Sequence, residues 1–385
     1  MADDTWWLDL NDLDDEQKAI IKLPLNGKHL LLGPPGSGKT NLVLLRASDF
    51  VGSKRPNVIV LIFTKELQSF IQRGSKNYNV ADEKILTIMK WSLGLLREHG
   101  VRTDDLPGDF EPRRLEIASR LHALFDRKPK LEHHLECILV DEVQDCLKPE
   151  IDLFFRAARH VFFAGDSRQQ IYRTDDIVDY VKSRVDETLA LTHHYRSGHE
   201  VCKAADVIGK NFGEEPILPT SNYKESKAKS DVKFVPCDAE DHQADEVIKR
   251  LEIQVRTYPG ELLGVISPRN EDAARIRAAI AASSLAPNLI DEGGLASDDD
   301  KTIHVCNMFD AKGLEYRAVH ITHGHNVHRL KEKQKRTVYT SVTRAKTSLT
   351  VYYIKRIPAY LEEARDEAGP KMRADARSLF PGRKK

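Results

Sequence analysis

A glycine-rich octapeptide offers the first residues whose type and spacing could do chemistry. Residues 33–40 read Gly-Pro-Pro-Gly-Ser-Gly-Lys-Thr and fit the pattern GxxxxGK[ST]. The apolar run His29–Leu32 predicts a strand before this loop, and Asn41–Asp49 predicts a helix after it. A strand, this loop and a helix in that order form the context in which the pattern binds phosphate. A glycine-rich turn without function is the weaker reading.

Each residue type in the loop has a separate chemical task. Gly33, Gly36 and Gly38 would let the backbone N–H groups wrap around phosphate oxygens. Lys39 would hold the β- and γ-phosphates, and Thr40 would be a ligand of Mg²⁺. The loop therefore predicts ATP and Mg²⁺ as cofactors.

A second apolar run ends in two acids and predicts the other half of the same site. The run Ile138–Val140 is followed by Asp141 and Glu142. Parallel sheets present such residues at a crevice beyond the carboxyl ends of their strands. Asp141 would support Mg²⁺, and Glu142 would orient or deprotonate the attacking water. Two acids after a strand often only cap it, but beside a phosphate loop they indicate catalysis.

The elements that must position these residues alternate between short apolar runs and helical patterns, which predicts an α/β fold with mostly parallel sheets. Helical patterns such as Arg114–Arg127 lie between the runs. The strand candidates are His29–Leu32, Val58–Phe63, Cys137–Val140, Val161–Ala164, Thr188–Leu191, Val232–Val235, Leu262–Ile266, Thr302–Cys306, Ala318–Thr322 and Leu349–Ile354. We place a domain boundary near residue 187, giving domains at 1–187 and 188–356 and a helical, basic tail at 357–385.

Composition limits where a ligand could bind. Lys and Arg number 59, and Asp and Glu also number 59, so any nucleic-acid site must be a local groove and not the whole surface. The five cysteines form no CxxC pair, which favours reduced thiols in a cytoplasmic protein. No apolar run approaches about 18 residues, so no membrane span is expected.

The residues after Glu142 carry a family resemblance. Residues 141–145, Asp-Glu-Val-Gln-Asp, resemble the DExQD box of UvrD/Rep/PcrA-type superfamily 1 helicases. Further segments resemble other motifs of that family in its order: 11–20 (NDLDDEQKAI), 58–64 (VIVLIFT), 165–172 (GDSRQQIY), 195–197 (YRS), 311–315 (AKGLE) and 340–346 (TSVTRAK). Any one of them is weak, but seven ordered matches exclude chance.

The resemblance implies two RecA-like P-loop domains with the ATP cleft between them. It implies that Gln169 joins the catalytic residues of domain one, and that Arg196 and Arg344 of domain two act as arginine fingers on the γ-phosphate. Gln17 is expected to bind the adenine edge, Tyr195 to stack on adenine, and Glu315 to contact ribose. Alone, either arginine would more often be a surface ion pair.

The same resemblance implies a binding path for single-stranded nucleic acid, which we call the track, but the residues themselves support it less. The family motifs place Phe63 and Tyr172 against a single strand, with Thr64, Lys65 and Arg173 near its phosphates. Phe63 and Tyr172 could instead be core aromatics. Single-stranded DNA is expected as the partner, with 3′-to-5′ movement as in the relatives, while RNA stays open because nothing reads the sugar.

Departures from the family concern the track and not the ATP site. Thr174 stands where relatives often carry a tryptophan, and Phe309 where they often have a histidine. Trp91 lies in a segment that usually reads TFHS, and either stacks on the strand or is buried.

Spacing predicts a motor without large accessory domains. Larger relatives insert such domains between Ser92 and Asp141 and between Ser197 and Thr302, and both stretches are too short here. At most a short helical insert is expected at Thr103–His134. Two functions stay open: a DNA-stimulated translocase or helicase, or an ATP-driven switch that gates a partner such as a nuclease. Either function would fit a role in genome repair or phage defence.

Overall fold

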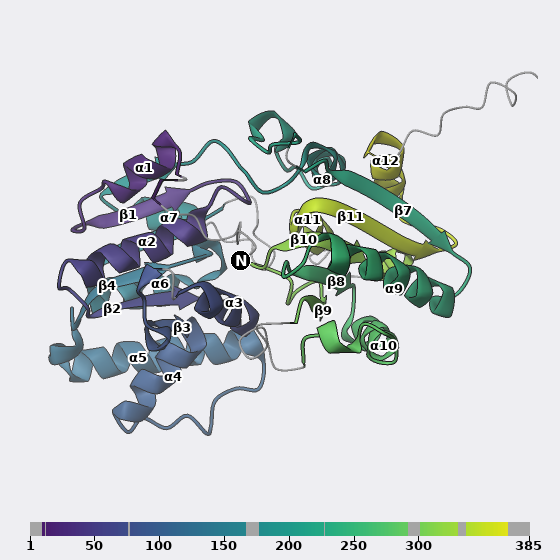
Figure 1. Cartoon of the computed structure of the whole chain (residues 1–385). Coiled ribbons are helices and arrows are strands. Elements are labelled where there is room, and N and C mark those ends of the chain that lie inside the picture. Colours follow the sequence, from purple (N-terminus) through teal and green to yellow (C-terminus); the bar gives the residue numbers. More distant parts are fainter. Residues whose placement is uncertain are drawn as a thin grey trace, which may run out of the picture.

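Two α/β units lie side by side in the molecule (Figure 1). The computed structural model describes residues 10–11, 13–75, 78–166, 177–226, 228–291, 301–329 and 336–368. All strand pairs in both units are parallel. The predicted α/β class with two parallel sheets is therefore confirmed.

The first unit holds a six-stranded sheet in the order β3-β2-β4-β5-β1-β6. Its strands are β1 (Lys28–Leu32), β2 (Val58–Ile62), β3 (Ile85–Thr87), β4 (Leu135–Val140), β5 (Ala158–Gly165) and β6 (Glu187–Ala190). Its helices are α1 (Asp15–Ile21), α2 (Lys39–Gly52), α3 (Lys65–Ser75), α4 (Ile88–Glu98), α5 (Phe110–Arg127), α6 (Lys148–Ala157) and α7 (Ile177–Lys182). One apolar core packs α1, α2 and α3 on one face of the sheet, and another packs α4, α5, α6 and α7 on the opposite face.

The second unit holds a five-stranded sheet in the order β7-β11-β10-β8-β9. Its strands are β7 (Asp231–Cys237), β8 (Leu263–Ser267), β9 (Ile303–Asn307), β10 (Tyr316–Ile321) and β11 (Ala345–Ile354). Its helices are α8 (His199–Lys210), α9 (Glu240–Thr257), α10 (Asn270–Ala281), α11 (Arg336–Val342) and α12 (Ala359–Ala368). Helices α8, α11 and α12 share one core, and α9 and α10 share the other.

The ten predicted strands are all present, with small shifts at their ends. Strand β3 was missed because its three residues, Ile-Leu-Thr, are too short to form a recognisable apolar run. The stretch between β3 and β4 holds α4, α5 and one short 3₁₀ turn at Pro129–Leu131, which agrees with a small helical insert.

Strand pairing and packing refine the division of the chain. Strand β6 pairs with β1, so the first sheet continues to Ala190, past the boundary predicted near residue 187. Leu361 and Ala364 of α12 are fully buried in the core that α12 shares with α8, so this part of the predicted tail belongs to the second unit. We propose that the first domain ends after Ala190 and that the second includes α12.

Within the described residues, no helix is both long enough and apolar enough to cross a membrane.

Two buried histidines are expected to make the second unit sensitive to acid. His304 on β9 bonds the Tyr316 hydroxyl at 2.8 Å, and His320 on β10 bonds the Tyr352 hydroxyl at 2.9 Å. Burial lowers the pKa of His304 to about 4 and that of His320 to about 3. Both stay neutral in the folded protein, whereas the unfolded chain binds their protons below about pH 6.5.

Stability should therefore fall as the pH drops from about 6.5 toward 4. Each histidine is expected to cost about 2 kcal/mol of unfolding free energy at pH 5 relative to neutral pH. Urea unfolding at pH 7 and at pH 5 measures this pH dependence, and in a His304→Gln variant the difference should be smaller by about 2 kcal/mol. Equal pH dependence in the variant and the parent protein would contradict the assignment.

Candidate active site

The glycine-rich loop joins the end of β1 to the start of α2. Gly38 is the N-cap of α2 with φ +85°, and Gly36 has φ +79°, a left-handed conformation that favours glycine. A Cβ added to Gly36 would collide with Arg196 of the second unit, so only glycine fits this contact. The Lys39 ammonium donates hydrogen bonds to the carbonyls of Gly33 at 2.8 Å and Pro34 at 2.9 Å, which folds the loop around the buried lysine.

The two predicted Mg²⁺ ligands meet across the sheet. The Thr40 hydroxyl donates to the Asp141 carboxylate at 2.6 Å. Glu142 follows in a left-handed conformation with φ +55°, and its N–H donates to Asp141 Oδ1 at 3.0 Å. The sharp turn directs the two adjacent carboxylates to different partners.

Gln144 has a position that the sequence did not reveal. It lies in the 3₁₀ turn Val143–Asp145 after Glu142 and donates its amide to the Glu142 carboxylate. Its side-chain oxygen accepts the N–H of Asp166 at 3.0 Å. Gln144 therefore ties Glu142 to the end of β5. It belongs to the DExQD box, but the box alone does not state which neighbour the amide holds.

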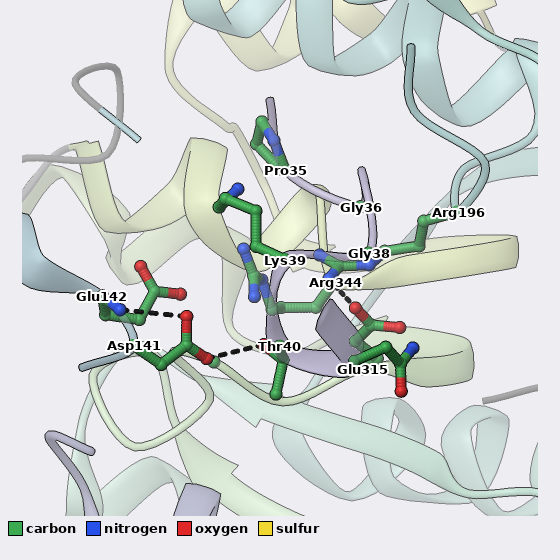
Figure 2. A pocket seen from close by; sticks show the side chains of 12 residues that line it. Pro35, Gly36, Gly38, Lys39, Thr40, Asp141, Glu142, Arg196, Glu315 and Arg344 are labelled. Carbon is green, nitrogen blue, oxygen red and sulfur yellow. Dashed lines mark hydrogen bonds and ion pairs between the residues drawn. The ribbon is translucent and has the colours of Figure 1, made fainter. Parts of the chain in front are cut away.

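The second unit brings Arg196, Glu315 and Arg344 to the same cavity (Figure 2). Arg196 forms an ion pair with Glu315. Arg344 is 2% exposed and donates to the carbonyls of Thr340 at 3.1 Å and Leu314 at 3.3 Å. The sequence did not predict that Glu315, assigned to ribose, holds Arg196.

Chain direction explains why the two sets of side chains meet. In the first unit, Thr40 follows the loop after β1, and Asp141 directly follows β4, so both lie beyond carboxyl ends of strands. In the second unit, Glu315 directly precedes β10 and Arg344 directly precedes β11. The carboxyl edge of one sheet therefore faces the amino edge of the other.

Charges in the cavity perturb one another strongly. Burial and the adjacent Glu142 raise the pKa of Asp141 to about 6. Burial alone would raise the pKa of Glu142, but Lys312, Lys39 and Arg344 together bring it below its usual value. Burial and the neighbouring Arg344 lower the pKa of Arg196 well below its usual value. Two mutually repelling guanidiniums beside a buried ammonium form a strong site for a polyanion.

The adenine residues implied by the resemblance also lie together. The buried Gln17 donates its amide to the Ser37 carbonyl of the phosphate loop at 3.0 Å. Asp14 caps α1, and its carboxylate accepts a hydrogen bond from the Tyr195 hydroxyl. Tyr195 N–H in turn donates to the Gly36 carbonyl at 3.0 Å. Both predicted base contacts thus border the loop, and the second unit touches it through Tyr195.

Polar atoms in the cavity fit a phosphate ligand. Ser37 Oγ and Arg196 Nε are buried without a hydrogen-bond partner among the described residues, and phosphate oxygens would accept from both. Hydroxyl and carboxylate oxygens, as on Thr40 and Asp141, are the ligand types that Mg²⁺ prefers. The cavity measures only about 40 Å³, so its walls must move apart before a triphosphate can enter.

The predicted nucleic-acid residues are only partly visible. Of these candidates, Tyr172 and Arg173 lie outside the described residues, as do the catalytic candidate Gln169 and Thr174. Phe63 is half-buried against the core of the first unit, and Lys65 is exposed. The Thr64 hydroxyl accepts the Leu67 N–H at 3.1 Å and so caps α3, which gives it a structural task as well.

Trp91 is buried. It is 8% exposed and packs against Phe154 with ring centroids 5.7 Å apart. Of the two alternatives for this residue, the structure therefore favours the core position over a stacking position.

An ion pair that the sequence did not predict joins the two units. Lys312 of the AKGLE segment contacts both carboxylate oxygens of Asp145 at 2.6 and 2.5 Å, and both side chains are nearly inaccessible. The Asp145 carbonyl accepts from Arg114 at 3.0 Å, which fixes its position further. The pair therefore links the two units in the closed arrangement.

Removing one partner of this pair should cost more than removing both. Lys312→Met leaves a buried carboxylate without its cation, so we expect about 3–5 kcal/mol of destabilisation. The double variant Lys312→Met with Asp145→Leu should recover much of that loss. Urea unfolding of the two single variants and the double variant measures the coupling. A double variant as unstable as the sum of the single ones would show that the pair contributes nothing.

Fold and site together define a class: a P-loop enzyme with two RecA-like units and charged groups from both units in one cavity. Comparison with known proteins agrees. Residues 16–175 match the family described as AAA domain, and residues 302–352 match the UvrD-like helicase C-terminal domain. The chain belongs to the UvrD-like helicases of superfamily 1.

Individual relatives are more distant. A protein named DNA helicase II from Haemophilus influenzae is 28% identical over an aligned length of 338 residues, gaps included, and the alignment covers 60% of this chain and 46% of that protein. The chain thus spans about half the length of this curated relative. A solved structure, the C-terminal domain of a possible DNA helicase from Lactobacillus plantarum WCFS1, is 19% identical with a TM-score of 0.32. The match covers 43% of this chain and 91% of that one.

Proposed function

We propose that this protein is an Mg²⁺-dependent ATPase that moves along single-stranded DNA. The observation that carries the proposal is the convergence of Lys39, Thr40, Asp141, Arg196 and Arg344 on one cavity between the units. Separate surface charges would not gather from two sheets around a phosphate-type loop.

Each residue then has a defined task. The loop N–H groups and Lys39 would bind the phosphates, for which Lys39 must leave the carbonyls of Gly33 and Pro34. Thr40 and Asp141 would hold Mg²⁺, which offsets phosphate charge when bound. Glu142, kept ionised by the surrounding cations, would orient the attacking water and accept its proton.

The arginines would couple chemistry to movement. Arg196 and Arg344 come from the second unit and would contact the γ-phosphate only when the cleft is closed on ATP. Hydrolysis removes the γ-phosphate that draws these arginines of the second unit toward the first, so the units separate. Repeated closure and opening displaces one unit relative to the other along a bound strand.

The direction of movement can be tested with blocked ends. We propose 3′-to-5′ movement, so ATP should speed release of streptavidin from a 5′-biotinylated oligonucleotide but not from a 3′-biotinylated one. Release from the 3′ end alone would reverse the direction, and release from neither end would exclude translocation. A matched RNA oligonucleotide tests whether the track is DNA.

A partner protein and a cytoplasmic role in repair or phage defence are also part of the proposal. The insert between β3 and β4 is small, which supports a partner chain that supplies duplex binding or nuclease activity. An ATP-driven switch that gates such a partner is the second candidate. The buried ion pair between Lys312 and Asp145 favours this second candidate, because a switch of this kind needs contacts that hold its closed state.

A further inference from the structure

A broad groove beside Phe63 extends well beyond the residues that the family resemblance assigns to nucleic acid. It encloses a cavity of about 1070 Å³ along β2, β3 and α4, with the start of α5 at its rim. This exceeds the roughly 300–1,000 Å³ of ordinary small-molecule sites. Its walls are mainly apolar side chains, including Leu86, Met89 and Leu93.

The rim of this groove carries an exposed aromatic ring outside every family motif. Phe110, the first residue of α5, is 55% exposed. Among the residues that the structure describes, it is the one phenylalanine, tyrosine or tryptophan in the exposed class. An exposed ring at the rim of an apolar groove extends that groove into a contiguous apolar patch, and such patches mark interaction sites.

Phe110 is held in place by a buried cation. Its ring meets that of Phe63 edge to face, with centroids 6.0 Å apart and planes at 82°. The Arg114 guanidinium lies 5.0 Å from the Phe63 centroid and 5.5 Å from the Phe110 centroid. Glu150 fixes that guanidinium with bonds of 2.9 and 2.5 Å. Phe110 is thus a preorganised platform and not a loose surface side chain.

The charges of the groove identify the kind of occupant. Lys65, Lys90 and Arg97 line it, with Glu98 as the only carboxylate among its lining residues. Apolar faces can stack on the bases of a single strand, and neighbouring cations can pair with its phosphates, so this lining suits single-stranded nucleic acid. An apolar protein segment would not require the three cations.

We propose that Phe110 stacks on a base of single-stranded DNA and that this groove is part of the DNA track. The inference rests on the proposed function and extends it to a residue of the helical insert. Arg114 also donates to the carbonyl of Asp145, so Phe110 itself lies two contacts away from the ion pair that joins the units.

The test compares aromatic and aliphatic side chains at one position. Binding of labelled oligo-dT is measured by fluorescence anisotropy for the parent protein, Phe110→Leu and Phe110→Trp. Leu115→Ala, at an exposed site on the same helix but outside the groove, is the matched control. Phe110→Leu should weaken binding about 5- to 150-fold, while Phe110→Trp and Leu115→Ala should stay near the parent protein.

An oligonucleotide with abasic sites separates stacking from groove shape. On this ligand Phe110→Leu and the parent protein should bind equally, because no base is present to stack. If Phe110→Leu and the parent protein bound oligo-dT with equal affinity, the inference would be overturned, and a protein partner would be the better candidate for the groove. An equal loss on both ligands would also overturn it, since the ring would then only shape the groove. A parent protein that binds no DNA would reject the proposed function itself.

Discussion

Replacing Arg344 by alanine is expected to lower kcat for ATP hydrolysis by about 10³- to 10⁵-fold. The guanidinium lies buried in the cavity, directly before β11, and faces Lys39 and Glu142 from the opposite unit. Its charge should act chiefly on the γ-phosphate as negative charge redistributes in the transition state. Affinity for a fluorescent ATP analogue should therefore change far less than kcat.

A control arginine separates this role from general effects on the second unit. Arg336→Ala removes a guanidinium from α11, the helix that leads to Arg344, but Arg336 bonds the Phe212 carbonyl outside the cavity. Its kcat should stay close to that of the parent protein. Because Arg344 is fully buried, thermal unfolding of both variants must show intact folding. An Arg344→Ala variant that folds and loses less than about tenfold in kcat would exclude the arginine-finger assignment.

Replacing Glu142 by glutamine is expected to lower kcat by about 10²- to 10⁴-fold, the contribution of a general base. Glutamine keeps the size of the side chain, and its oxygen can still accept the hydrogen bond from the Gln144 amide. The turn with φ +55° should therefore persist. It removes the carboxylate that Lys312, Lys39 and Arg344 keep ionised. ATP should bind and remain unhydrolysed.

Glu136→Gln is the matched control for this change. Glu136 lies on the same strand, β4, but pairs with Arg55 away from the cavity. Single-turnover hydrolysis of prebound ATP compares the three proteins directly. Similar rates for Glu142→Gln and the parent protein would require a different general base.

Local sequence patterns were enough to predict the helices and strands and the part of the site that the first unit contributes. The phosphate loop, the strand before it and the two acids after β4 are contiguous patterns, and their chemistry follows from residue type and spacing. The parallel sheets followed from apolar runs with helices between them. Strand β3 escaped because three residues do not establish a period, and hydrogen bonding to β2 decides its conformation.

Contacts between distant segments could not be predicted in the same way. Lys312 and Asp145 belong to quoted motifs, yet nothing in either motif states that they meet across the cleft. Arg114 was expected only as part of a helix, and tertiary packing places it under Phe63 and against Asp145. Phe110 carries no motif at all, and only its exposure and its neighbours indicate a function.

Steady-state ATP hydrolysis with and without single-stranded DNA tests the proposed motor most directly. Lys39→Ala and Glu142→Gln serve as inactive references, since each removes one element of the phosphate chemistry. We predict turnover that DNA stimulates strongly and that both substitutions abolish. Turnover in the parent protein that is the same with and without DNA would contradict the motor and leave an ATP switch controlled by another protein.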